Sequence, residues 1–237
     1  MSKPKNWPAS LPYLKAPLYG KDISTTQIQF LRRKPPHDGD DDDDGHDDHV
    51  PIAPASSPAT ETPCSRVRIQ AIQDPSHPAN GQLGLFAAQN IAPGELILAY
   101  LGRLHGRGTT SEESDYDLWL DREVDVAVDA AREGNEGRFV NDYRGIGGRE
   151  RANARFGNVW CERWGEVCVG IWAVGGGKTK NGGDGKKKEK KKKKKKKSDG
   201  GGIKKGEEIL VSYGKGFWEE RKKGDGDGDD GGEGVLQ

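Results

Sequence analysis

The sequence predicts a mainly β domain with few short helices, because short apolar segments recur about every ten residues between glycine-rich turns. Polar and apolar residues alternate along residues 65–72, which is the pattern of a strand with one buried face. Residues 95–101 are mostly apolar and end at Gly102, as expected of a buried strand. Further strands are expected at residues 84–87, 117–120, 124–128, 158–161, 167–174 and 208–213, the pair 158–161 and 167–174 forming a hairpin. A short helix is expected at residues 25–33, and a brief helix or loop at residues 135–140.

Composition divides the chain into one domain and three low-complexity segments. Only 32% of the 237 residues are hydrophobic, and 35 Gly and 13 Pro interrupt the chain. We expect residues 1–63 to be a disordered N-terminal region rich in Pro and Asp, and residues 224–237 to be an acidic Gly/Asp tail. The domain is expected at residues 64–223, with a disordered Gly/Lys-rich insertion at 175–202. The entropy cost of closing a loop grows only with the logarithm of its length, so the insertion is compatible with a folded domain.

Cysteine count and hydropathy exclude several classes of protein. Cys64, Cys161 and Cys168 are the three cysteines, and none belongs to a CxxC pair, which excludes a disulfide framework and a four-cysteine zinc site within the chain. No apolar run approaches the roughly 18 residues of a membrane helix. An acidic stretch, Asp40–Asp44 with Asp47 and Asp48, is interrupted by His37, His46 and His49, and we interpret it as a solvated segment and not as a metal site. We expect an intracellular monomer in the nucleus or cytoplasm, without a metal or a membrane partner.

The charge distribution bears on the partner. Residues 64–177 hold 12 Arg and no Lys against 16 acidic residues, which suits a basic peptide better than a nucleic acid. Lys186–Lys197 contains 11 lysines in 12 positions, and the run favours the nucleus. Such a run binds phosphates non-specifically, serves as a nuclear-import signal, or is a solvated insertion. Non-specific nucleic-acid binding through this run is an accessory expectation.

Five segments carry a stronger signal when they are read in order. They are GLFA with IAPGE and YLG at residues 84–102, DYDLWLD at 115–121, VDA at 128–130, RFVN at 138–141, and IKKGEEILVSYG at 203–214. Together they span about 135 residues, nearly the whole expected domain. In this order they resemble the SET-domain family of protein-lysine methyltransferases.

The resemblance implies a fold of small curled β-sheets with a threaded C-terminal segment, S-adenosylmethionine as methyl donor, and a lysine of a histone or another protein as acceptor. It implies two catalytic residues, the hydroxyl group of Tyr213 and the channel-lining Tyr116. The implied cofactor-binding residues are Leu83, Gly84 and Leu85 at the methionine end, Arg138, Phe139, Asn141 and Asp142 at the adenosine side, and Trp218 over the adenine. The implied substrate channel consists of Tyr116, Val211 and Phe217.

The implied chemistry explains these residue types. A free lysine has a pKa of about 10.4 and is protonated at neutral pH, so it is not a nucleophile. A narrow apolar channel disfavours the ammonium form and lowers the pKa of the lysine. Methyl transfer is an in-line displacement, so the protein contributes mainly by aligning the amine with the methyl group, and aromatic walls attract the cationic methyl group.

The sequence departs from the family pattern at several positions. Asp142 stands where the family usually has histidine, residues 143–151 intervene before Ala152 and Asn153, which take the place of Pro-Asn, and Val211 stands where many members have Phe or Tyr. The cysteine-rich flanking segments are missing. An inactive SET-like module that binds a basic peptide or partner is therefore a second hypothesis. Tyr213 and Tyr116 could also be packing residues, Gly84 a turn glycine, and Asn141 a turn-capping amide.

Overall fold

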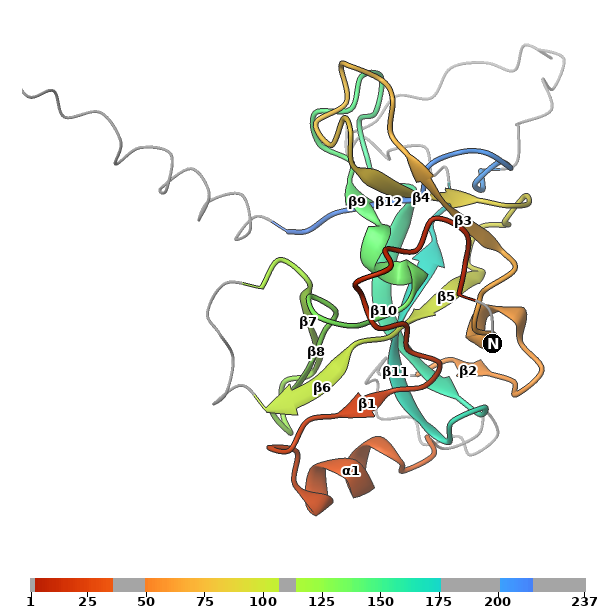
Figure 1. The fold of residues 1–237 in the computed structure, drawn as a ribbon. Coiled ribbons are helices and arrows are strands. Elements are labelled where there is room, and N and C mark those ends of the chain that lie inside the picture. The colour runs from red at the N-terminus through yellow and green to blue at the C-terminus, as the bar shows by residue number, and fades with distance from the viewer. Residues whose placement is uncertain (1–2, 36–49, 107–113, 176–200, 215–237) are drawn as a thin grey trace, which may run out of the picture.

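The computed structural model describes residues 3–35, 50–106, 114–175 and 201–214 (Figure 1). The strands are β1 (Leu18–Tyr19), β2 (Ile52–Ala53), β3 (Val67–Ala71), β4 (Leu83–Ala87), β5 (Leu96–Tyr100), β6 (Arg103–Gly106), β7 (Asp117–Asp121), β8 (Val126–Asp129), β9 (Asn141–Asp142), β10 (Ala154–Cys161), β11 (Glu166–Ala173) and β12 (Leu210–Val211). The helices are α1 (Thr25–Leu31) and the 3₁₀ turns η1 (Pro58–Thr60) and η3 (Glu136–Phe139). The mainly β prediction is confirmed.

Within the described ranges the strands form small sheets. Two sheets have four strands, in the orders β1-β6-β8-β7 and β2-β10-β11-β5, and two further pairs are β3-β4 and β9-β12. The expected hairpin is confirmed: β10 and β11 pair antiparallel from Ala154 opposite Ala173 to Cys161 opposite Glu166. Its turn contains Gly165 at φ +66°, a conformation that glycine adopts without a steric penalty.

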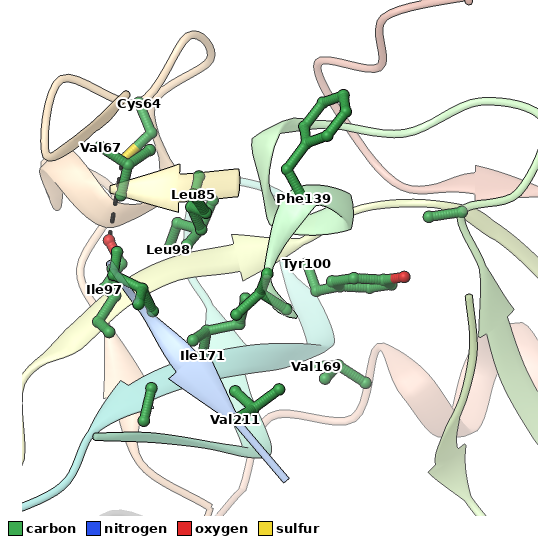
Figure 2. Close-up of a cluster of buried hydrophobic side chains, with 14 of the residues drawn as sticks. Cys64, Val67, Leu85, Ile97, Leu98, Tyr100, Phe139, Val169, Ile171 and Val211 are labelled. Carbon is green, nitrogen blue, oxygen red and sulfur yellow. Dashed lines mark hydrogen bonds between the residues drawn. The ribbon is translucent and has the colours of Figure 1, made fainter. Parts of the chain in front are cut away.

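The larger of two apolar clusters in the described part of the chain gathers side chains from several sheets, and Figure 2 shows part of it. Leu85 from β4, Ile97 and Leu98 from β5, and Ile171 from β11 are fully buried in it. Val211 from β12 joins the same cluster, so the end of the described chain packs against strands from its middle. Alternation in β3 places Val67 and Ile69 in the core and leaves the side chains between and after them exposed.

The N-terminal region differs from the expectation. Residues 3–35 and 50–63 are folded against the domain: β1 pairs with β6, and β2 pairs with β10. Trp7, Ile23 and Leu31 are buried in the shared core. The region has few apolar residues among many prolines, so its composition is typical of a disordered segment. A strand of two residues that covers the edge of a distant sheet has no periodic pattern in the sequence. The expected helix is confirmed as α1, which begins with a capping box of Ser24 and Gln27.

Trp7→Ala tests whether this region belongs to the cooperative unit. The Trp7 ring makes edge-to-face contacts with Tyr13 at 4.9 Å and with Phe139 at 5.5 Å between centroids. We expect the substitution to lower the free energy of unfolding by about 3 kcal/mol, because it empties a buried aromatic site. Urea denaturation measures the loss, with the 42% exposed Phe30 replaced by Ala as control. Equal stability of the two variants would show that the N-terminal region unfolds separately.

Several expectations fall outside the described residues, namely the Lys186–Lys197 run, the acidic tail at 224–237, and the side chains of Phe217 and Trp218. In the described part of the chain, no helix has the length and apolar character to span a bilayer. The same residues contain no cluster of three or more His, Cys, Asp or Glu arranged to hold a metal ion. Cys64, Cys161 and Cys168 are buried free thiols, and burial raises the pKa of Cys64 to about 12.

Candidate active site

The last described segment is held inside a loop of the chain. β12 pairs in parallel with β9, so that Leu210 lies opposite Asn141 and Val211 opposite Asp142. At the other end of this loop, Asn153 donates its backbone N–H to Leu210 O at 3.1 Å and accepts from Leu210 N through its side chain at 2.8 Å. The loop from residue 141 to residue 153 therefore contacts β12 from both of its ends. Figure 1 shows β9 and β12 side by side.

A cavity of about 300 Å³ opens beside β9 and β12. Its volume is at the lower end of the range of small-molecule sites. It is lined by seven residues that the sequence assigned to the site and by six others. The seven are Leu83, Tyr116, Arg138, Phe139, Asn141, Asp142 and Tyr213, and the others are His77, Pro78, Ala79, Gln82, Asp115 and Arg144.

A smaller cavity of about 110 Å³ lies next to it and has aromatic walls. The two cavities share Asp115, Tyr116, Arg138 and Tyr213, so these residues separate one cavity from the other. The remaining lining residues of the smaller cavity are Tyr100, Ser114, Asp117, Leu118, Gly137, Val140, Phe156 and Ser212. Four aromatic side chains, those of Tyr100, Tyr116, Phe156 and Tyr213, thus surround a narrow space.

Hydrogen bonds fix Tyr213 at this boundary. Its hydroxyl group donates to Val140 O at 2.7 Å, and its backbone N–H donates to Asp142 Oδ2 at 2.7 Å. Asp142 also accepts from the backbone N–H of Arg144 and from its guanidinium group, both at 2.8 Å. The carboxylate therefore ties the closing segment to the turn that follows β9.

The neighbouring aromatic wall is equally constrained. The guanidinium carbon of Arg138 lies 4.5 Å from the ring centroid of Tyr116, a cation–π geometry, while Nε donates to Ala130 O at 3.0 Å. Tyr100 donates its hydroxyl to Tyr116 O at 2.8 Å. Burial raises the pKa of Tyr100 well above its usual value, so this hydroxyl remains neutral and keeps donating.

Of the residues that were assigned from the sequence and that the structure describes, three line neither cavity. Leu85 and Val211 are fully buried in the core, so their side chains contribute to packing. Gly84 is buried beside the Glu208 carboxylate, and a Cβ atom at this position would lie 2.8 Å from Glu208 Oε1. The absence of a side chain at Gly84 therefore provides space for the Glu208 carboxylate.

Sequence reasoning missed other lining residues. Tyr100 ends the apolar run of β5 and opens the YLG segment of the family resemblance, but the sequence assigned it no role in the site. Phe156, His77 and Arg144 lie in segments without a recognisable pattern, and only the folded arrangement brings them to the cavities.

A third cavity of about 430 Å³ lies between the N-terminal segment and β3. Its deepest charged group is Glu136, whose two oxygens accept from Cys64 N at 2.9 Å and from the Tyr13 hydroxyl at 3.0 Å. Burial raises the pKa of Glu136. Both oxygens of this carboxylate are therefore bonded within the protein, and none of the residues that the sequence assigned to the site lines this cavity.

Comparison with known proteins gave one kind of match. No family model and no curated protein matches the chain. Among solved structures, polycomb repressive complex 2 of Chaetomium thermophilum matches with a TM-score of 0.40 and 23% identity over 63% of this chain. The autoinhibited complex bound to S-adenosylmethionine gives a TM-score of 0.41 and 22% identity over 67% of this chain. The matched regions span 15% and 17% of those longer chains.

Proposed function

We propose that the chain is a SET-like protein-lysine methyltransferase that uses S-adenosylmethionine. The observation that carries the proposal is the position of Tyr213 between two cavities of different character. One cavity has the size and polar groups for a small-molecule cofactor, and the other is a narrow aromatic space. Segments near residues 83, 141 and 213, far apart in the chain, line the larger cavity together.

The residues of the larger cavity fit the proposed cofactor. Leu83 and Phe139 offer apolar surface, Asn141 offers a side-chain amide, and Arg138 and Asp142 carry opposite charges. This mixture suits a ligand that has an aromatic base at one end and an amino-acid group at the other. When bound, S-adenosylmethionine would supply an electrophilic methyl group. The role of the chain is to orient it so that the reacting carbon lies near Tyr213.

The smaller cavity fits the aliphatic stem of a lysine. Tyr100, Tyr116 and Phe156 exclude water from its walls, and this environment favours the neutral amine that can react. The hydroxyl of Tyr213 is fixed by Val140 O, so its oxygen can contact the methyl group during transfer. Asp115 and Asp117 line the same cavity and attract a cationic side chain from solvent. A basic peptide, such as a histone tail, is the proposed substrate class, and the nucleus is the proposed location.

Two assays test the proposal with purified full-length protein. Calorimetry with S-adenosylmethionine and S-adenosylhomocysteine should show saturable binding. Incubation with the labelled donor and a panel of histones and cell extract should transfer label to lysine. Absence of binding at high micromolar cofactor would overturn the proposal.

Asp115→Asn tests the attraction of a basic substrate. We expect the KM for a lysine peptide to rise roughly two- to fivefold with little change in kcat, as is typical of a single exposed charge pair. The effect should shrink as salt is added. Steady-state kinetics at two salt concentrations measure both, with the exposed Asp74→Asn as control. An unchanged KM at low salt would remove Asp115 from the substrate path.

A second candidate function is a peptide-binding module without turnover. It is favoured by Asp142, whose carboxylate accepts hydrogen bonds from Tyr213 and Arg144, a structural role that requires no cofactor. Such a module would bind a basic peptide in calorimetry and transfer no label. Nucleic-acid retention through Lys186–Lys197 remains an accessory proposal. Deleting the run should abolish salt-sensitive retention, and unchanged retention would refute it.

A further inference from the structure

Hydrogen bonds link three polar side chains into one network along the wall of the larger cavity. His77 Nε2 lies 3.1 Å from Glu208 Oε2, and Asn141 Nδ2 donates to Glu208 Oε1 at 2.9 Å. His77 and Asn141 line the cavity, whereas Glu208 lies behind them with its side chain 11% exposed. The three residues come from parts of the chain that are more than 60 residues apart.

The bond from Ala79 to His77 fixes the position of the hydrogen on the imidazole ring. Ala79 donates its backbone N–H to His77 Nδ1 at 3.0 Å, so Nδ1 carries no hydrogen and accepts this bond. The imidazole is therefore the neutral tautomer with its hydrogen on Nε2. That hydrogen points to Glu208 Oε2, and His77 donates the bond.

The carboxylate then decides how the Asn141 amide is oriented. An ionised carboxylate only accepts hydrogen bonds, so Asn141 must turn its NH₂ group toward Glu208. The carbonyl oxygen consequently lies on the opposite side of the amide. Among the described residues no protein group donates to this oxygen, while Asn141 itself lines the cavity. The amide thus offers an acceptor, and not a donor, to a ligand.

The backbone holds Glu208 where it can make both contacts. Glu208 pairs with Phe86 in an isolated bridge, and its carbonyl oxygen accepts from the Asn153 side chain at 2.8 Å. Its carboxylate passes over Gly84, where a side chain would collide with Oε1. The absence of a side chain at residue 84 is therefore a condition for the contact between Glu208 and Asn141.

We propose that His77 and Glu208 are positioning residues that hold the Asn141 amide with its carbonyl toward the cavity, so that the bound molecule must present an N–H donor there. The inference rests on the proposed function, because the donor would be an amino group of S-adenosylmethionine. Neither His77 nor Glu208 takes part in the transfer itself. Their effect is on cofactor affinity and on the choice between ligands that do and do not carry the donor.

Glu208→Gln is the central test. A glutamine has one accepting oxygen and one donating NH₂ group, so it cannot accept from His77 and Asn141 together. We expect the Kd for S-adenosylhomocysteine to rise roughly three- to tenfold, the usual worth of one hydrogen bond. The KM for S-adenosylmethionine should rise by the same factor while kcat changes little. Glu207→Gln is the matched control, because the Glu207 carboxylate pairs with Arg149 and not with His77 or Asn141. This variant should leave both the Kd and the KM unchanged.

Gly84→Ala provides a second route to the same result, since the added Cβ displaces the Glu208 carboxylate without altering any of the three polar residues. Nitrogen NMR of the wild-type protein without cofactor provides a third readout that does not depend on activity. It should show His77 as the Nε2–H tautomer and a slowly exchanging side-chain NH₂ group for Asn141. These signals decide the inference even where a variant fails to fold.

The outcomes separate the inference from the proposed function. If the wild-type protein does not bind S-adenosylhomocysteine, the proposed function fails and the inference fails with it. If the wild-type protein binds and Glu208→Gln binds equally well, or if His77 carries its hydrogen on Nδ1, the inference alone is overturned. Weaker binding by Glu208→Gln with an intact Glu207→Gln control supports it.

Discussion

Replacing Tyr213 by phenylalanine is expected to lower the rate of methyl transfer roughly 10²- to 10³-fold, the usual effect of removing one preorganised polar group at a reacting centre. The hydroxyl is fixed on Val140 O at 2.7 Å, and Tyr213 lines both cavities. Phenylalanine keeps the ring and its packing, so the free energy of unfolding should fall by only about 1 kcal/mol, for one lost hydrogen bond. Label transfer to peptide, measured at saturating donor, gives the loss in kcat.

Tyr143→Phe is the control for this substitution. Tyr143 is also a partly buried tyrosine and follows Asp142 directly, but its side chain lines neither cavity. Full activity of Tyr143→Phe beside an inactive Tyr213→Phe that still binds S-adenosylhomocysteine would assign the loss to the reaction. An active Tyr213→Phe would contradict the catalytic role and would favour the packing role of this tyrosine.

The strands with strong local patterns could be predicted, and those defined by distant partners could not. Alternation in β3 and the apolar run of β5 are properties of consecutive residues. β1 and β2 have two residues each, and they exist because β6 and β10 offer free edges. No window of the sequence around Leu18 or Ile52 contains that information, which is why the N-terminal region was assigned to disorder.

The candidate site divides in the same way. The segments around Arg138, Asn141 and Tyr213 could be assigned because they resemble family motifs that follow one another in a fixed order, and these three residues line the larger cavity. The contacts of His77 with Glu208 join residues that are 131 positions apart, and no spacing rule connects them. The steric reason for Gly84 likewise became visible only with the Glu208 carboxylate in place.

At Asp142 the sequence departs from the family pattern, which usually has histidine, and the structure gives a reason for the carboxylate. Its carboxylate accepts three hydrogen bonds, one from Tyr213 N and two from Arg144. A neutral histidine ring has one accepting nitrogen and could take only one of them. We therefore interpret the aspartate as part of the connection between β9, the following turn and the closing segment.

Asp142→Ala is accordingly expected to lower the free energy of unfolding by about 2–4 kcal/mol, because it leaves two backbone N–H groups and a guanidinium group without their acceptor. The Arg144 side chain is 32% exposed, so water replaces its partner in part and the backbone bonds account for most of the loss. Urea denaturation followed by tryptophan fluorescence measures the change. Methyl transfer should fall more than S-adenosylhomocysteine binding, because Tyr213 loses the bond that fixes its backbone.

Asp142→Asn is the matched variant for this last prediction, since it keeps the shape and one accepting oxygen but replaces the other by a donor. We expect it to lose about half as much stability as Asp142→Ala, because the single oxygen can still accept from one of the two backbone N–H groups. Arg144→Leu removes the guanidinium group and leaves both backbone bonds, so it should be the mildest of the three. A loss below about 0.5 kcal/mol for Asp142→Ala, as for an ordinary surface residue, would show that β12 is held in the loop by its strand pairing alone.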